Sequence, residues 1–183
     1  TPNGDYFIDP ASLDNTENYI SFYKTDYSIR KSFECLVTEV SNNPDFINNN
    51  NSVMTGQQLR TYRLACAATG EYVAFFGGTV ALGQAAIVTS INRVNGIYER
   101  DLSVRMNLVA NNTNIVFTNS GTDPYTNGNG STMLGQNQTT CDNVTYIGSA
   151  NYDIGHVFST GGGGVAGLGV VCSGGNKARG VTG

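Results

Sequence analysis

The chain has 183 residues, of which 39% are hydrophobic and only 13% are charged, and its formal net charge is −4 at pH 7. A chain of this size forms one domain, or a small domain with an arm. No basic cluster is present to neutralise nucleic-acid phosphates. The longest apolar runs fall far short of the ~20 residues that a membrane-spanning helix needs. We therefore expect no nucleic-acid partner and no membrane span.

The first 51 residues predict an arm followed by a linker. Hydrophobic and polar residues alternate in Tyr19–Thr25 and again in Phe33–Val37, which favours a β-hairpin-like arm. Two strands alone are marginal in water, so the arm must pack on something or be tied down. Asn42–Ser52 contains a proline and a run of asparagines, a composition typical of an exposed linker. We place a domain boundary between residues 51 and 52.

The four cysteines are far apart in the sequence and form no C-x-x-C pair, which argues against a structural zinc site. Two disulfides in a protein outside the cytosol are the expected arrangement. The spacing leaves all three connectivities open, and the simplest is local pairing of neighbours in the sequence. The four residues are Cys35, Cys66, Cys141 and Cys172.

A strand–helix–strand unit follows the linker. Arg60–Ala68 alternates as a strand does, and a 3.6-residue apolar period predicts a helix from about Thr79 to Arg100, with Thr79 as its N-cap. Asp101–Ala110 alternates again. One long crossover between two strands implies parallel pairing with a right-handed connection. The expected apolar stripe of the helix comprises Val80, Ile87, Ile91, Val94 and Tyr98.

The next stretch predicts a brief strand at Asn114–Asn119, a polar loop, and a second helix from Ser131 or Thr132 to about Tyr146. The loop loosely echoes the start of a calcium-binding loop through Asp123, but Leu134 stands where the twelfth-position acidic ligand should be. Calcium is therefore a weak alternative to an ordinary turn-rich loop. The residues expected on the buried side of the helix are Leu134, Cys141, Val144 and Ile147.

The last third of the chain predicts three short strands, Tyr152–Phe158, Val165–Cys172 and Ala178–Thr182. Glycine-rich turns at Gly161–Gly164 and Gly174–Asn176 separate them, because glycine reaches backbone angles closed to other residues. The predicted fold is an α/β domain: a twisted, mixed, mostly parallel sheet of about five strands with two main helices, plus a short N-terminal β arm.

His156 is the only histidine in the sequence. A catalytic zinc needs three protein ligands, most often with several histidines among them, so this chain cannot supply a histidine trio. His156 shares one face of its predicted strand with Tyr152, Ile154 and Phe158, which favours a hydrogen-bonded core histidine. Gly161–Gly164 lacks the G-K-[ST] of a phosphate-binding loop. The sequence thus contains no catalytic residues that we can assign.

Two segments carry a family resemblance: Tyr152–Gly183, and the helix and strand IVTSINRVNGIYERDLSVRMNLVA. Both resemble bacterial reprolysin-like metallopeptidases of the adamalysin branch of the metzincins, and the likeness covers about Arg60–Gly183. It implies the N-terminal subdomain, residues 52–183, of a zincin-like catalytic domain in a secreted or cell-surface zinc metalloendopeptidase. Zinc would be the cofactor, and peptides or proteins the substrate. The family's zinc-binding motif, H-E-x-x-H-x-x-G-x-x-H, is absent from this chain.

The same resemblance implies roles for particular segments. The strand before the zinc helix binds substrate in this family, and its matching positions here are Gly167, Leu168 and Gly169. Residues 1–51 would be the tail of a pro-segment, in which Cys35 is either an inhibitory zinc ligand or an ordinary disulfide partner. Cys172 would pair with a cysteine further downstream.

The resemblance also implies that a C-terminal catalytic part completes the enzyme and that this chain alone is inactive. The alternative is a non-catalytic secreted or cell-surface module that binds peptide or carbohydrate.

Overall fold

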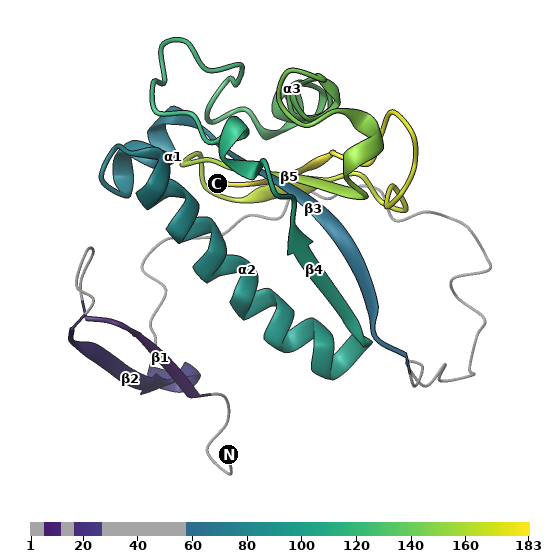
Figure 1. Ribbon diagram of the computed structural model, residues 1–183. Helices are drawn as coiled ribbons and strands as arrows, with labels where there is room; N and C mark the ends of the chain where they lie inside the picture. The colour runs from purple at the N-terminus through teal and green to yellow at the C-terminus, as the bar shows by residue number, and fades with distance from the viewer. Residues whose placement is uncertain (1–5, 12–16, 27–57) are drawn as a thin grey trace. The chain divides into compact units, whose positions relative to one another are not determined.

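The computed structural model describes residues 6–11, 17–26 and 58–183 (Figure 1). The chain divides into two compact units, Thr1–Phe33 and Glu34–Gly183, which are described separately. The predicted boundary between residues 51 and 52 lies outside the described residues and stays a prediction. No helix in the described ranges combines the length and the apolar character that crossing a membrane requires.

The smaller unit contains an antiparallel hairpin of β1 (Tyr6–Pro10) and β2 (Tyr19–Tyr23), followed by the 3-10 turn η1 (Lys24–Asp26). The predicted β arm is therefore confirmed, and β2 matches the predicted strand at Tyr19–Thr25. Its partner is β1, which the alternation pattern did not reveal, whereas Phe33–Val37 lies outside the described residues.

The larger unit is built on a five-stranded sheet in the order β4-β3-β5-β7-β6. Parallel pairs join the first four strands of this order, and β6 pairs antiparallel with β7 at the edge. This confirms the predicted mixed, mostly parallel sheet. The strands are β3 (Arg60–Ala68), β4 (Val104–Leu108), β5 (Ile154–Phe158), β6 (Gly164–Ala166) and β7 (Gly180–Thr182).

The two main helices, α2 (Val80–Leu102) and α3 (Gly130–Asp142), lie on opposite faces of the sheet (Figure 1). Thr79 caps α2 as predicted, because its side chain accepts a hydrogen bond from the Leu82 N–H. Asn129 caps α3, before the predicted cap at Ser131 or Thr132. A short helix that the sequence analysis missed, α1 (Gly70–Phe75), directly follows β3.

Strand β3 is buried on both faces because it lies between the two helices. Leu64, Cys66 and Ala68 face the cluster under α2, while Ala65 and Ala67 face the cluster under α3. A strand covered on both sides loses the apolar–polar alternation of a half-exposed strand, and its last five residues are accordingly all apolar and buried.

Two local predictions are wrong. The predicted strand at Asn114–Asn119 is instead the 3-10 helix η3 (Asn112–Ile115), with only a single bridge from Val116 to Ala68. Helix α3 ends at Asp142 rather than Tyr146, so Val144 is 88% exposed instead of buried. A further 3-10 turn, η4 (Ser149–Asn151), precedes β5.

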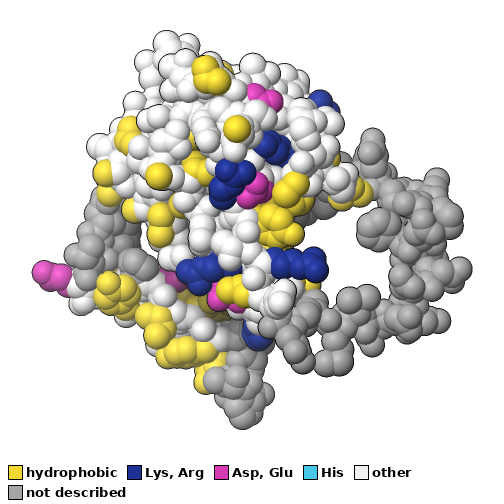
Figure 2. Space-filling model, turned by 45° about the vertical axis from the view of Figure 1, so that its right-hand side comes forward, with side chains coloured by type: hydrophobic (Ala, Val, Ile, Leu, Met, Phe, Trp, Pro, Cys, Tyr) yellow, Lys and Arg dark blue, Asp and Glu magenta, His cyan; other side chains and the backbone are white. Residues whose placement is uncertain are grey.

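The surface of the larger unit matches the low charge content of the sequence. On the face shown in Figure 2, backbone and uncharged polar atoms predominate, and charged side chains are scattered rather than gathered into one patch. The described residues form isolated close ion pairs, such as Arg63 with Asp153 at 2.7 Å and Arg105 with Glu99 at 2.8 Å.

Candidate functional site

Strand β6 forms one edge of the sheet and is joined to β7 on its inner side. The Gly167 N–H donates to the Arg179 carbonyl at 2.9 Å, and the Gly183 N–H donates to the Gly163 carbonyl at 2.9 Å. These two bonds show that residues 163, 165 and 167 are the ones that face β7.

The residues between them face the other way. Because hydrogen bonding alternates along an antiparallel strand, the main-chain groups of Gly164 and Ala166 point away from β7. Within the described residues, no strand pairs with that side of β6. The outer edge of β6 therefore presents main-chain donors and acceptors flanked by small residues.

The opposite edge of the sheet, β4, is closed at its centre. Asn95 of α2 donates from Nδ2 to the Met106 carbonyl at 2.8 Å, and its Oδ1 accepts from the Met106 N–H at 2.8 Å. One side-chain amide thus takes the place of a neighbouring strand. The charged Arg105 beside it further disfavours pairing with another chain.

The same arrangement occurs inside the sheet. Beyond the end of β4, the Cys66 N–H of β3 donates to Asn112 Oδ1 at 2.8 Å, and Asn112 Nδ2 donates to the Cys66 carbonyl at 2.9 Å. Just before β7, Asn137 and Gln138 of α3 satisfy the carbonyl and the N–H of Ala178. Side-chain amides therefore take the place of a strand partner at Met106, Cys66 and Ala178.

The turn between β5 and β6 is made by Gly161–Gly164. Gly162 and Gly163 have φ angles of 76° and 84°, in the left-handed region that favours glycine. Gly161 also packs against the backbone of Gly128, where an added Cβ would lie 2.7 Å from the Gly128 Cα. The glycines are thus required by backbone angle and by close approach.

The loop that carries Gly128 is anchored by polar side chains. Asn127 accepts from the Thr160 N–H at 3.1 Å and donates to Thr160 Oγ1 at 3.0 Å, which fixes the loop to the end of β5. Both carboxylate oxygens of Asp123 accept main-chain N–H groups, from Gly70 at 2.6 Å and from Tyr125 at 2.9 Å. Asp123, the residue behind the weak calcium alternative, therefore has a structural role at the start of α1.

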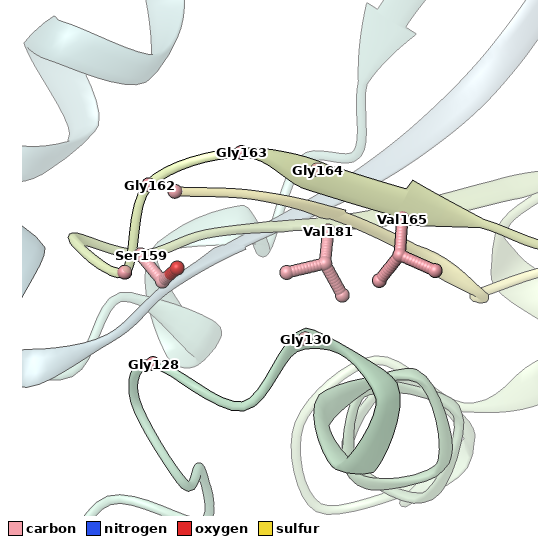
Figure 3. A pocket seen from close by; sticks show the side chains of 10 residues that line it. Gly128, Gly130, Ser159, Gly162, Gly163, Gly164, Val165 and Val181 are labelled. Carbon is pink, nitrogen blue, oxygen red and sulfur yellow. The ribbon is translucent and has the colours of Figure 1, made fainter. Parts of the chain in front are cut away.

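A small hollow of about 50 Å³, open to solvent, lies between this loop and the start of β6 (Figure 3). Seven glycines form most of its wall, together with one serine and two valines, and no charged side chain lines it. Ser159 is 7% exposed. The lining residues are Gly128, Gly130, Ser159, Gly161, Gly162, Gly163, Gly164, Val165, Val181 and Gly183.

The predicted strand Val165–Cys172 is wrong in extent, because β6 ends at Ala166. The chain then turns through Gly169 and Cys172, whose φ angles are 67° and 60°. Of the three predicted substrate-binding residues, Gly167 already donates its N–H to β7, and Leu168 projects with its side chain 49% exposed. Their part in substrate binding stays a prediction.

His156 lies in the interior of β5 and makes a structural hydrogen bond, as predicted. Its Nε2 is 2.9 Å from Thr182 Oγ1 on β7, and its ring packs edge-on against Phe158. Burial lowers the pKa of His156 to about 4, so the ring is neutral at pH 7. The side chain ties β7 to β5.

Cys66, Cys141 and Cys172 are free thiols, so the predicted pair of disulfides is wrong. Two disulfides would need all four cysteines, and Cys35 lies outside the described residues. Cys66 and Cys141 are buried, and burial raises the pKa of Cys141 to about 12, which makes it an unreactive core residue.

The described residues do not fit a zinc site. No group of three or more His, Cys, Asp or Glu side chains in residues 6–11, 17–26 and 58–183 could hold a metal ion. His156, the one histidine of the sequence, is half-buried on β5 and bonded to Thr182.

The structure adds residues that the sequence analysis did not select: Gly164 and Ala166 on the open edge, and Ser159 in the hollow. Their signal in the sequence was the glycine-rich run before an apolar segment. Which of these residues would face outward depends on the pairing of β6 with β7, which the sequence did not show.

A family model described as "Metallo-peptidase family M12B Reprolysin-like" matches residues 84–183, more than half of the chain. The match begins within α2 and includes both strands β6 and β7. No curated protein matches the chain.

Proposed function

Because the chain belongs to the reprolysin-like metallopeptidase family M12B, we propose that its larger unit is the substrate-holding part of a secreted metalloendopeptidase. In this proposal, an extended stretch of a protein substrate pairs with the outer edge of β6. The family is a family of zinc peptidases, and a peptidase acts on peptides or proteins.

The open edge of β6 is the observation that carries this proposal. An extended peptide can add to a sheet edge through main-chain hydrogen bonds, which need outward N–H and C=O groups and room for close approach. Gly164 and Ala166 provide both, since neither has a large side chain. The other edge is not equivalent, because Asn95 already occupies the main chain of Met106.

The exposed apolar residues after β6 extend this surface. Leu168 and Val171 are each 49% exposed and follow the edge strand directly. We propose that Gly167–Gly169 contact the peptide at this end, with Leu168 packing on one of its side chains. Gly167 would contribute its small size rather than its N–H, which is donated to Arg179.

The chemistry of peptide hydrolysis needs a zinc site that these residues do not form. Zinc supplies the family's activated water when it is bound. Since the described donors do not fit zinc, we propose that its ligands belong to a C-terminal part outside these 183 residues and that this chain alone is inactive. Residues 1–51 would be the tail of a pro-segment, and secretion is consistent with the family and the composition.

A non-catalytic peptide-binding module is the second candidate. The absence of a fitting zinc donor set in the described residues favours it, and it would use the same edge of β6. Steady zinc-dependent cleavage of a protein substrate by the purified chain would contradict both the second candidate and the expected inactivity.

Replacement of Ala166 by proline tests the peptide-binding edge. Ala166→Pro removes the outward N–H but leaves the bonds between β6 and β7, because Ala166 does not face β7. We expect a blocked heptapeptide of alternating Thr and Val to shift the Gly164 and Ala166 amide signals of the ¹⁵N-labelled chain. The variant should bind about tenfold more weakly or worse.

Ala166→Ser is the matched control, because it keeps the N–H and should bind as the unchanged chain does. Equal binding by the proline variant, or shifts confined to residues outside β6, would overturn the proposal.

A further inference from the structure

Gly167, directly after β6, leaves one face of the sheet without a side chain close to the open edge. Side chains alternate along a strand, and Val165 packs on the cluster under α3, so position 167 also faces the α3 side. A Cβ added to Gly167 would lie 3.1 Å from Val170 Cγ1 and 3.4 Å from Arg179 Cβ. The side chains of Val170 and Arg179 therefore border the place that a side chain at position 167 would take.

Arg179 lies one strand inside the open edge. The Gly167 N–H donates to its carbonyl at 2.9 Å, and the next pair along the two strands is Ala166 with Gly180. These contacts fix Arg179 beside Gly167. Because Gly167 has no side chain, the long side chain of Arg179 can lie across this end of β6, toward the edge.

The charge of Arg179 is not paired within the described part of the chain. The residue is exposed, and it takes no part in the ion pairs formed there, which involve Arg63, Arg100 and Arg105. A guanidinium group binds a carboxylate through two parallel N–H donors. Arg179 can therefore bind a carboxylate without first giving up one from its own chain.

The distances allow Arg179 to meet a side chain of a peptide paired with β6. Neighbouring strands lie about 4.8 Å apart, so such a peptide lies two strand spacings from Arg179. An extended arginine side chain is longer than one spacing, and a glutamate side chain covers most of the other. Residues opposite one another on neighbouring strands point the same way, so the peptide residue opposite Gly167 also faces the α3 side.

We propose that Arg179 is a specificity-determining residue, which selects peptides that carry a glutamate, or less favourably an aspartate, opposite Gly167. This inference rests on the proposed pairing of a peptide with β6. The Arg179 guanidinium donates to the carboxylate oxygens above Gly167, and Val170 contacts the CH₂ groups of the same side chain. Glutamate is favoured because its additional CH₂ group extends its reach.

The preference has to come from this local contact. The chain has a formal net charge of −4, so its overall charge does not attract acidic peptides. Glutamine has the length of glutamate but forms only neutral hydrogen bonds with an arginine acceptor-free group, which are weaker than those of a carboxylate. Lysine would place a second positive charge beside Arg179.

The test uses blocked heptapeptides of alternating Thr and Val whose central residue is Glu, Asp, Gln or Lys. Dissociation constants are measured by titration into the ¹⁵N-labelled chain. At low ionic strength we expect the Glu peptide to bind about threefold to fivefold more tightly than the Gln peptide, with Asp between them and Lys weakest. The preference should shrink at about 1 M salt, where the Debye length is about 3 Å.

Arg179→Gln should make the Glu and Gln peptides bind equally, without weakening the Gln peptide. Arg60→Gln is the matched control, because it removes an exposed arginine from the start of β3, which β5 and β7 separate from β6. It should leave the preference unchanged. Since Gly167 bonds to the main chain of Arg179 and not to its side chain, Arg179→Gln should fold, and its amide spectrum checks this.

The outcomes separate the two proposals. If no peptide shifts the β6 amide signals, the peptide-binding function itself fails. If the Glu and Gln peptides shift them with equal affinity, peptide pairing stands and the role of Arg179 is refuted. The same conclusion follows if Arg179→Gln keeps the preference for Glu or if Arg60→Gln abolishes it.

Discussion

The two edges of the sheet differ in how their outward main-chain groups are satisfied. At β4, the amide of Asn95 bonds to both main-chain groups of Met106, as a neighbouring strand would. At β6, the outward groups of Gly164 and Ala166 face no strand in the described part of the chain. An unpaired edge invites pairing with another chain, and proteins usually protect it.

The difference between the edges shows one structural role of the many asparagines in this sequence. Asn95 and Asn112 each bond to both main-chain groups of one strand residue, and Asn137 bonds to a third strand segment at Ala178. An asparagine amide has one acceptor and a donor in the geometry of a peptide group, so it can replace a missing strand residue. A side-chain amide thus closes the β4 edge at Met106, whereas the outer side of β6 faces no strand within the described residues.

The largest effect is expected from Asn112→Ala, which removes the amide that bonds to β3 at Cys66. Asn112 is 1% exposed and also donates to Gln84 Oε1 at 2.9 Å. Its loss leaves the buried N–H and carbonyl of Cys66 without partners, each at a cost of about 1–3 kcal/mol. We expect the free energy of unfolding to fall by about 3–5 kcal/mol, measured by urea denaturation.

Asn114→Ala is the matched control, since Asn114 belongs to the same 3-10 helix but donates only one exposed bond, to the Tyr146 carbonyl. It should cost less than about 1 kcal/mol. Similar losses for both variants would show that the amide at position 112 does not substitute for a strand.

Periodicity in the sequence predicted most of this fold. β3, α2 and β4 follow it closely, because each has a long, regular pattern and α2 has a recognisable cap at Thr79. The stretch Asn114–Asn119 was mistaken for a strand, since Ile115 at the end of η3 and Val116 after it are apolar and enter the two core clusters. No sequence pattern marks Asn112, because its role depends on its position beside the Cys66 main chain in the fold.

The sequence predicted the segment that contains the candidate site, but not which residues lie on its open edge. The glycine-rich turn and the apolar run after it correctly indicated a turn and a strand that begins near Val165. The run at Val165–Cys172 contains Gly169 and Cys172 in the left-handed region, so the strand ends early and the outward residues are Gly164 and Ala166. No sequence pattern predicts that a cysteine adopts left-handed backbone angles. The register of β6 is set only by its pairing with β7.

Lowering the pH should destabilise the β6 edge of the sheet before the β4 edge. The expected loss of stability is intermediate among these predictions. The folded-state pKa of His156 is about 4, below the ordinary value of 6.5, so the unfolded chain binds its proton first as the pH falls. The contribution of neutral His156 is therefore complete above about pH 6.5 and is lost between pH 6.5 and 4. We expect a loss of about 2 kcal/mol from pH 7 to 4.5, reduced for partial exposure of the ring.

His156→Gln keeps a polar side chain near Thr182 but does not titrate, so its stability should change less over the same pH interval. Hydrogen exchange should show that amides of β7 and β6 lose protection in acid before those of β4, because His156 bonds to β7. Equal losses of stability in both proteins would remove His156 as the cause.

The smallest change in stability is expected from Asn95→Ala, which opens the closed edge. Two hydrogen bonds to Met106 are lost, at about 1 kcal/mol each, and alanine returns about 0.5 kcal/mol of helix propensity within α2. We expect a net loss of about 1–2 kcal/mol in urea denaturation. Asn92→Ala, an exposed change on the same helix, should cause no loss.

The binding experiment on Asn95→Ala decides what the comparison of edges means. If a free main chain is what makes an edge accept a peptide, the Thr–Val heptapeptide should now shift the Met106 amide signal as well as those of β6. In the unchanged chain, only β6 should respond. If Asn95→Ala lowers stability but the peptide does not shift the Met106 amide signal, Arg105 and its ion pair with Glu99 protect that edge without the asparagine. Peptide binding at β6 would then depend on the glycines and alanine that flank its open groups, and not on the open groups alone.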